Sequence, residues 1–374
     1  EAQANATRAW LDAREASAPA EVEEFAEMLH AGSRYPAPIE AAAGQCRSIT
    51  MAEATAIGQE ALMKGGPVRI RNASDHWAAR SWDDATLARE VGGVPMQMLA
   101  MPGPEHPTLD GTHGGAILEP AQYGVAFKDY LRLLDALAPT SRADAPPFAA
   151  YLAMLNLLRL PSLLAHVCIP EALPSSALSL TNLWVGGHLM RNGLHFDQYD
   201  NLLFQLAGSK RALIYPPADA AHLYYGPSPM RRHVFSLPEG FAKESKEEKV
   251  RHNVARLNIF ASDLLDTHPT VADASPTLCE IHPGDALFIP KGWHHAVIST
   301  AAERRNIAVN LWYDLQHGTA ELRTLLHMFQ QEGCSDVAAS IGAGAGRDEA
   351  AEAVSVGVDA RADRVQRMQL RESS

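Results

Sequence analysis

The amino-acid sequence predicts a mainly β core with surrounding helices, an α+β fold whose core is a sandwich or jelly-roll barrel. Short apolar runs punctuated by Gly, Pro or Asp fill much of the stretch between residues 181 and 312. Segments with helical periodicity lie on both sides of that stretch. A chain of 374 residues is long enough to bury a substantial core around one such barrel.

Seven segments have the length and composition of strands, being rich in Leu, Ile, Val, Phe and Trp and bounded by turn-forming residues. They are residues 181–187, 202–207, 211–215, 277–282, 286–289, 295–299 and 306–312. Inward and outward side chains alternate along a barrel strand, so polar residues at inward positions would line the mouth of the barrel.

Four further segments have helical periodicity, and the first two end at Gly pairs, which are stop signals. They are residues 51–64, 82–91, 127–137 and 322–331. A short helix is also expected at residues 22–29, within an Ala- and Glu-rich opening stretch.

Composition favours an enzyme located in the cytoplasm, the nucleus or both. No apolar run reaches membrane-spanning length, so no membrane association is expected. The cysteines at positions 46, 168, 279 and 334 are scattered without any CxxC spacing, which predicts reduced thiols. A net charge of −12 makes a nucleic-acid partner unfavourable.

Two segments about a hundred residues apart carry candidate metal ligands. His195 and Asp197 are two residues apart, so on a strand their side chains share one face. A second segment offers His294 and His295 after a Pro-Gly turn. Two His and one carboxylate with open positions opposite are typical of non-haem Fe(II) sites. Strand alternation separates His294 from His295 but does not say which of them faces inward.

Either segment alone is a weak signal. A His-x-Asp triplet is expected by chance about once in a chain of this composition. A lone His beside a Trp is more often a packed core residue than a ligand. The surrounding motifs decide the interpretation.

Six blocks in order resemble the JmjC/cupin-like Fe(II) and 2-oxoglutarate-dependent dioxygenase family. They are residues 183–187 (LWVGG), 195–197 (HFD), 200–211 (DNLLFQLAGSKR), 215–217 (YPP), 283–290 (PGDALFIP) and 307–313 (IAVNLWY). Within the family, the sequence most resembles the small JmjC hydroxylases, the group of the hypoxia-factor asparaginyl hydroxylase and the small JmjC lysyl hydroxylase. Residues 66–73 with Trp77 and Trp82 resemble that group's N-terminal entry. The resemblance runs from about residue 60 to about residue 330.

The resemblance implies a double-stranded β-helix, the jelly-roll or cupin barrel, with N-terminal and C-terminal helical decoration. The expected parts are an N-terminal helical extension over residues 1–60, a barrel domain over 61–317 and a C-terminal helical region over 318–374. An insert at 218–276 interrupts the barrel domain, either as a solvated helix and loop or as a lid facing the substrate. The C-terminal region either packs on a partner subunit, as in a homodimer, or is mobile.

The resemblance also implies the site residues. His195, Asp197 and His295 would be the metal ligands, because the family's second His falls five residues after the proline, here Pro290. His294 stands where relatives commonly carry a second Trp. Residues that match partners of 2-oxoglutarate are Lys210 as the anchor of its far carboxylate, Tyr151 and Asn192 as further partners of that carboxylate, and Asn201 and Asn310 as inward amides beside cosubstrate and metal. Without the resemblance, Lys210 would be taken for a surface lysine at a turn.

The implied activity is hydroxylation of an amino-acid side chain of a protein substrate, with Fe(II), 2-oxoglutarate and O2 consumed to give succinate and CO2. Three alternatives stay open: a metal-dependent cupin that does not use 2-oxoglutarate, a tRNA-base hydroxylase, and a non-catalytic JmjC-like binding module. The acidic balance disfavours tRNA, whereas the basic run Arg231, Arg232 and His233 favours it locally.

Overall fold

The computed structural model of the chain describes residues 2–13, 34–110, 116–138, 148–226, 228–242, 249–251, 253–301 and 305–314. The helices expected at 22–29 and 322–331 and the C-terminal region at 318–374 lie outside the described residues. Among the residues that are described, no helix combines the length and the apolarity needed to cross a membrane.

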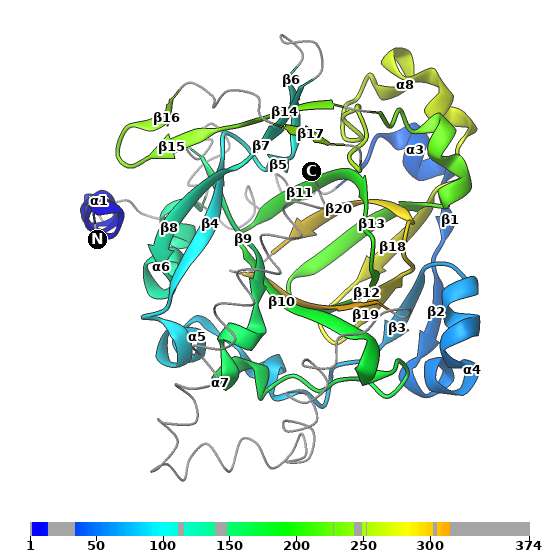
Figure 1. The fold of residues 1–374 in the computed structure, drawn as a ribbon, viewed down its shortest axis with the longest axis horizontal. Helices are drawn as coiled ribbons and strands as arrows, with labels where there is room; N and C mark the ends of the chain where they lie inside the picture. The colour runs from blue at the N-terminus through cyan, green and yellow to red at the C-terminus, as the bar shows by residue number, and fades with distance from the viewer. Residues whose placement is uncertain are drawn as a thin grey trace.

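Two sheets form the body of the molecule (Figure 1), and each has four barrel strands at its centre. The barrel strands are β10 (Leu178–Gly186), β11 (Leu189–Phe196), β12 (Asp200–Ala207), β13 (Ser209–Tyr215), β18 (Thr277–Ile281), β19 (Ala286–Ile289), β20 (His294–Thr300) and β21 (Asn306–Tyr313). All seven expected strands are present, and β11 is an additional one. The prediction of a jelly-roll α+β fold is therefore confirmed.

The larger sheet has the order β2-β3-β19-β12-β21-β10-β9-β4-β8, and the smaller has the order β1-β18-β13-β20-β11-β5. Their outer strands are β1 (Gly44–Gln45), β2 (Arg47–Thr50), β3 (Val68–Arg71), β4 (Pro95–Met101), β5 (Glu105–His106), β8 (Ala121–Ala126) and β9 (Ala149–Asn156). Residues 1–60, expected to be a helical extension, thus also supply two short strands, because β2 pairs with β3 and β1 pairs with β18.

Two accessory sheets flank the barrel. One, at the top of Figure 1, joins β6 (Thr108–Asp110) and β7 (Ala116–Glu119) to two strands of the 218–276 insert, β14 (Ser228–Arg232) and β17 (Lys249–Arg251). The other is a hairpin of β15 (Val234–Ser236) and β16 (Gly240–Ala242). This part of the insert is therefore paired β structure.

Helices surround the sheets. They are α1 (Ala2–Asp12), α3 (Ala37–Ala42), α4 (Met51–Lys64), α5 (Asp84–Val91), α6 (Phe127–Ala136), α7 (Pro161–Leu164) and α8 (Leu264–Thr267), with 3-10 turns η1 (Ala78–Ser81), η2 (Leu157–Arg159), η3 (Ser175–Ala177), η4 (Pro217–His222) and η5 (Pro269–Asp273). The helix expected from residue 82 begins at Asp84, since the Asp83 carboxylate caps it by accepting from the Thr86 amide at 2.7 Å. Helix α4 is kinked at Gly58, where φ is 75°.

Strand alternation sorts most of the apolar side chains into three large clusters, beside a small fourth one of Met101, Tyr151 and Met190. One fills the barrel interior between the sheets, including Leu203, Ile214 and Val297. The largest covers the outer face of the nine-stranded sheet against α5, α6 and α7. A third covers the outer face of the six-stranded sheet. The outer clusters bury the outer face of the barrel strands, so a polar residue on the inward face lies beside the apolar interior cluster and must find a partner there.

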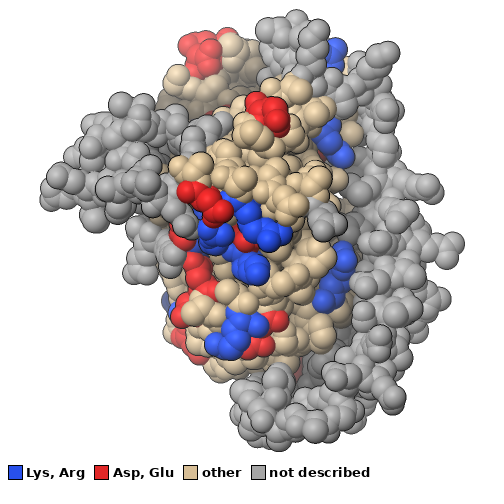
Figure 2. Space-filling model, turned by 90° about the vertical axis from the view of Figure 1, so that its left-hand side faces the viewer, with Lys and Arg blue, Asp and Glu red and all other residues tan. Residues whose placement is uncertain are grey.

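The surface around α1 and α6 carries both signs of charge, as Figure 2 shows. Arg132 of α6 pairs with Asp12 of α1 at 3.3 Å and approaches Asp129 at 3.8 Å. Because acidic and basic groups are intermixed here, this face has no single-sign field of the kind that attracts nucleic acid.

The prediction of reduced cysteines is wrong for Cys46 and Cys279, which form a disulfide with each other, and for Cys168, which is also disulfide-bonded. Cys46 and Cys279 are 233 residues apart, so no spacing pattern links them. The parallel pairing of β1 with β18 places Gln45 opposite Leu278. The residues that follow these two, Cys46 and Cys279, have their Cα atoms 4.8 Å apart, which is within the range for a disulfide. The expectation for Cys334 lies outside the described residues.

Tyr130 of α6 bridges an irregular point of the larger sheet. The register between β9 and β10 shifts between Leu183 and Val185, where regular ladder bonds are interrupted. The buried Tyr130 hydroxyl donates to the Val185 carbonyl at 2.6 Å and accepts from the Leu152 amide at 2.8 Å. One side chain thereby satisfies two backbone groups that the shifted strands do not pair.

We expect Tyr130→Phe to lower the free energy of unfolding by about 1–3 kcal/mol, because it leaves a buried carbonyl and a buried amide without partners. Urea denaturation followed by circular dichroism measures this directly. An unchanged free energy of unfolding would show that the two backbone groups find other partners.

Candidate functional site

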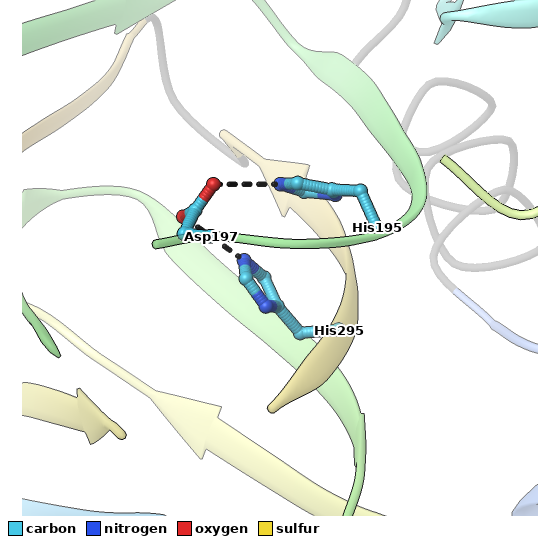
Figure 3. Close-up of side chains that lie close together, drawn as sticks. All are labelled: His195, Asp197 and His295. Atoms are coloured by element: carbon cyan, nitrogen blue, oxygen red, sulfur yellow. Dashed lines mark ion pairs between the residues drawn. The ribbon is translucent and has the colours of Figure 1, made fainter. Parts of the chain in front are cut away.

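Pairing of β11 with β20 brings two histidines together inside the barrel. His195 lies directly opposite His295 in the register of the two strands, and their ring centroids are 4.3 Å apart. Asp197 follows the end of β11, and its two oxygens lie 3.9 Å from His195 Nε2 and 3.6 Å from His295 Nε2 (Figure 3). One ligand atom from each residue lies within 4.8 Å of the others, so one ion could contact all three.

Backbone carbonyls orient both imidazoles. His195 Nδ1 lies 2.8 Å from the Gly193 carbonyl, and His295 Nδ1 lies 3.0 Å from the Trp293 carbonyl. A carbonyl only accepts, so each Nδ1 carries the proton and each Nε2 presents a lone pair toward Asp197. Such outer hydrogen bonds fix the tautomer and orientation of metal-binding histidines.

Burial acts on the charge of His295, and a backbone hydrogen bond acts on the position of the Asp197 segment. Burial, followed by repulsion from His195, lowers the pKa of His295 to about 4, which keeps the imidazole neutral and able to bind a metal. The Asp197 carbonyl accepts from the Gly292 amide at 3.0 Å. Gly292 has a φ of 77°, a conformation that favours glycine, and it ties the turn before β20 to the carboxylate segment.

The structure places His294 on the opposite face of β20. Its ring lies 5.6 Å from that of Phe196 and 4.8 Å from that of Tyr225, outside the group of the other two histidines. Ala296 and Ile298, which share its face, belong to the cluster on the outer side of the six-stranded sheet. The geometry therefore agrees with the choice of His295, and the assignment of all three residues as iron ligands stays a prediction.

Lys210 lies inside the barrel on β13, and not at a surface turn. It is 4% exposed, pairs with Ser299 in the register of β13 with β20, and donates from Nζ to the Ser299 hydroxyl at 2.6 Å. Burial alone lowers the pKa of Lys210 to about 7. Among the described residues no carboxylate forms an ion pair with it. A buried cation without an anion is costly unless a ligand supplies one.

Tyr151 of β9 converges on the same point, since its buried hydroxyl is hydrogen-bonded to Ser299. Burial raises the pKa of Tyr151, so the phenol stays protonated and can donate to an anion. Ser299 thus links Lys210 to Tyr151. Sequence reasoning missed Ser299, and its only signal was its inward position two and four residues after Val297 and His295.

Asn192 also reaches the interior, opposite Val297 in the pairing of β11 with β20. Its Oδ1 is buried and has no hydrogen-bond partner among the described residues. On β20, His295 of the candidate metal group and Ser299, the partner of Lys210, are four residues apart, which is about 13 Å along the strand. Asn192 is paired with Val297, midway between these two residues.

Asn201 and Asn310 form a hydrogen-bonded chain with Trp184. Trp184 Nε1 donates to Asn310 Oδ1 at 2.6 Å, and Asn310 Nδ2 donates to Asn201 Oδ1 at 3.1 Å. Both amides are buried. These hydrogen bonds orient the two asparagine side chains, which come from β12 and β21. All the expected site residues therefore lie in the barrel interior or at its end that carries His195, Asp197 and His295. Their binding roles stay predictions.

Known proteins support the fold and the family. Residues 54–319 match the cupin-like domain. Lysine-specific demethylase JMJ32 of Arabidopsis thaliana is 31% identical over 160 residues, which are 41% of this chain and 44% of that protein. Jumonji C domain-containing protein 5 of Drosophila melanogaster is 26% identical over 261 residues, 67% of this chain and 55% of that protein.

A third relative carries a different name. tRNA wybutosine-synthesizing protein 5 of Homo sapiens is 34% identical over 119 residues, 32% of this chain and 29% of that protein. The aligned segments cover 29–55% of the three relatives' own lengths. With the match spanning most of the jelly-roll, and with JmjC proteins among its relatives, the chain belongs to the cupin-like JmjC family.

Proposed function

We propose that this protein is an Fe(II)- and 2-oxoglutarate-dependent oxygenase that hydroxylates an amino-acid side chain of a protein substrate. The single observation that carries the proposal is Lys210, a buried ammonium that has no carboxylate partner among the described residues and shares the barrel interior with the group of His195, Asp197 and His295. The Lys210 ammonium and the candidate metal group lie at separate places in the barrel interior. This arrangement matches a ligand that carries an anion at one end and a metal-chelating group at the other.

The donor set fits the metal. Two imidazole nitrogens and one carboxylate, with the remaining positions open, form the facial triad of non-haem Fe(II) oxygenases. When bound, Fe(II) and 2-oxoglutarate supply the oxidation of a C–H bond by O2, with release of succinate and CO2. The chain's own contribution is to orient the imidazoles, neutralise the far carboxylate of the cosubstrate and exclude water.

The residues around Lys210 fit that carboxylate. The ammonium provides the charge, and the Ser299 hydroxyl and the protonated Tyr151 phenol provide further hydrogen-bonding groups. The unpartnered Asn192 Oδ1 only accepts hydrogen bonds, so it cannot bond to a carboxylate, which also only accepts. The Asn192 side chain can bind a carboxylate only by donating from Nδ2. The expected role of Asn192 is thus restricted to donation from Nδ2.

A tRNA substrate is the second candidate, and the relatives favour it specifically. Besides the human protein, tRNA wybutosine-synthesizing protein 4 of Gibberella zeae is 31% identical over 195 residues, 50% of this chain and 15% of that protein. The mixed charges around α1 and α6 do not support it. Demethylation, suggested by the name of the Arabidopsis protein, would use the same metal and cosubstrate.

An anaerobic visible spectrum with Fe(II), recorded before and after addition of 2-oxoglutarate, tests the proposal without a known substrate. We expect a weak charge-transfer band that disappears in His195→Ala and His295→Ala and persists in the matched control His294→Ala. Fe(II) affinity should fall by more than about 100-fold in the first two variants, beyond the 10–100-fold typical of losing an outer partner.

Other outcomes of this experiment point elsewhere. Iron bound without a band would favour a cupin that does not use 2-oxoglutarate. Absence of iron binding would favour a non-catalytic module. Loss of binding in His294→Ala, with His295→Ala unaffected, would reverse the assignment of the second histidine.

Lys210→Met separates binding from stability. Without the ammonium, the affinity for 2-oxoglutarate should fall by about 10–100-fold, since hydrogen bonds to charged groups contribute about 1.5–3 kcal/mol. The Tm of the ligand-free protein should rise by about 2 °C or more, because an unpaired buried amine is replaced by an apolar chain of similar size. Calorimetric titration and thermal unfolding measure the two effects. A lower Tm with unchanged affinity would make Lys210 a structural residue.

The affinity for 2-oxoglutarate should also depend on pH. The pKa of Lys210 is about 7 in the free protein, and pairing with a carboxylate would raise it. Binding therefore takes up a proton above pH 7, so the Kd should rise by about tenfold per pH unit from 7 to 9 and stay flat below 7. Titrations across this range should show the slope in the wild type, while Lys210→Met should lack it.

A further inference from the structure

The outer edge of β11, the strand that carries His195, is covered by segments outside the eight barrel strands. Its inner neighbour is β20, but that register shifts between Asn192 and His195. On the other side, β5 pairs with Arg191 and Asn192 only. At Gly193 the segment after β5 lies beside the strand at ordinary contact distance, since a Cβ there would lie 3.4 Å from the Pro107 carbonyl. The metal-binding end of β11 therefore leaves β5 before it reaches His195.

Residues 253–260 of the insert, which we call the strap, lie along the edge of β11 beyond the point where β5 ends. The Ala255 amide donates to the Leu194 carbonyl at 2.9 Å, and the Phe196 amide donates to the Asn253 carbonyl at 3.1 Å. Val254 forms an antiparallel bridge with His195 itself. The strap thus pairs with β11 on both sides of the candidate ligand.

Asn253 adds a side-chain contact to this pairing. Its Nδ2 donates to the Phe196 carbonyl at 3.2 Å, one residue before Asp197. Asn253 therefore accepts from the Phe196 amide with its carbonyl and donates to the Phe196 carbonyl with its side chain. Both backbone groups of the residue between His195 and Asp197 are held by one residue of the strap.

The strap is firmly attached to the barrel. Ala255, Leu257 and Ile259 are buried in the cluster on the outer face of the six-stranded sheet. The Arg256 amide donates to the Tyr224 carbonyl at 3.1 Å, and Phe260 stacks on Tyr35 with ring centroids 5.6 Å apart. The insert is here a packed part of the barrel wall, so its contacts with β11 are anchored at several points.

We infer that Asn253 is a positioning residue that holds His195 and Asp197 in the arrangement a metal requires. The inference rests on the proposed metal site. A ligand segment held by its neighbours loses less freedom when the ion binds, so the strap should raise metal affinity. By linkage, a bound metal should stabilise the strap to the same extent.

Mn(II) titration and hydrogen exchange of the whole chain test this inference without any turnover. We expect Asn253→Ala to weaken Mn(II) binding by about 10-fold, at the lower end of the range for outer partners of metal ligands. Exchange of the Phe196 and Ala255 amides should be faster in Asn253→Ala. Mn(II) should slow exchange of the Ala255 amide in the wild type and slow it less in the variant.

Two further variants keep the result interpretable. Asn253→Leu keeps a side chain of similar size but cannot donate and adds no charge, so it should resemble Asn253→Ala; it also serves if the alanine variant does not fold. Thr270→Ala is the matched control, because Thr270 lies in the same insert and bonds the His222 carbonyl, away from β11. It should leave Mn(II) affinity and both amides unchanged.

The outcomes separate the two proposals. Wild-type Mn(II) affinity in folded Asn253→Ala and Asn253→Leu, with His195→Ala impaired, would overturn the role of Asn253 and leave the metal site intact. Equal losses in Thr270→Ala would reduce the effect to general destabilisation and also overturn it. Mn(II) binding that His195→Ala does not weaken would overturn the metal site and the inference with it.

Discussion

The pairing of β11 with β20 is the constraint on which the site depends. It sets His195 opposite His295, while the pairing of β13 with the other edge of β20 sets Lys210 opposite Ser299, four residues further along β20. Because side chains alternate along a strand, a slip of one residue would turn His294 inward and send His295 to the outer face. The apolar clusters oppose such a slip, since it would exchange the residues that pack on the outer faces for those that pack in the barrel interior.

The barrel interior combines two kinds of buried polar group. The Trp184, Asn310 and Asn201 chain is internally satisfied and therefore rigid. Lys210 has only the Ser299 hydroxyl as a hydrogen-bond acceptor among the described residues, and its lowered pKa reflects the cost of burial. A group that destabilises the free protein and would be neutralised by a ligand is typical of a binding site, where stability is given up for function.

Elements outside the eight barrel strands complete the site. Tyr151 comes from β9, whose irregular pairing with β10 is bridged by Tyr130 of α6. The strap comes from the insert and pairs with β11 beside His195. The disulfide joins Cys46, the residue after β1, to Cys279 of β18 on the wall of the barrel interior. The common jelly-roll therefore supplies the candidate metal ligands, and the surrounding segments fix how these side chains are held.

The sequence by itself determined the fold class, seven of the eight barrel strands, and His195 and Asp197 as candidate ligands. These depend on local information: apolar alternation, turn residues and the two-residue spacing of His195 and Asp197, which places both on one face. The choice of Lys210 and of the other partners of the cosubstrate came from the family resemblance, since a local pattern alone favours a surface lysine at a turn. Only the tertiary structure decided which face of β20 is inward, because alternation is symmetric between the two faces. It alone showed Ser299, the Cys46–Cys279 disulfide and the contacts of Asn253. Each of these joins residues that are distant in sequence, and such pairing depends on strand register, which no local pattern encodes.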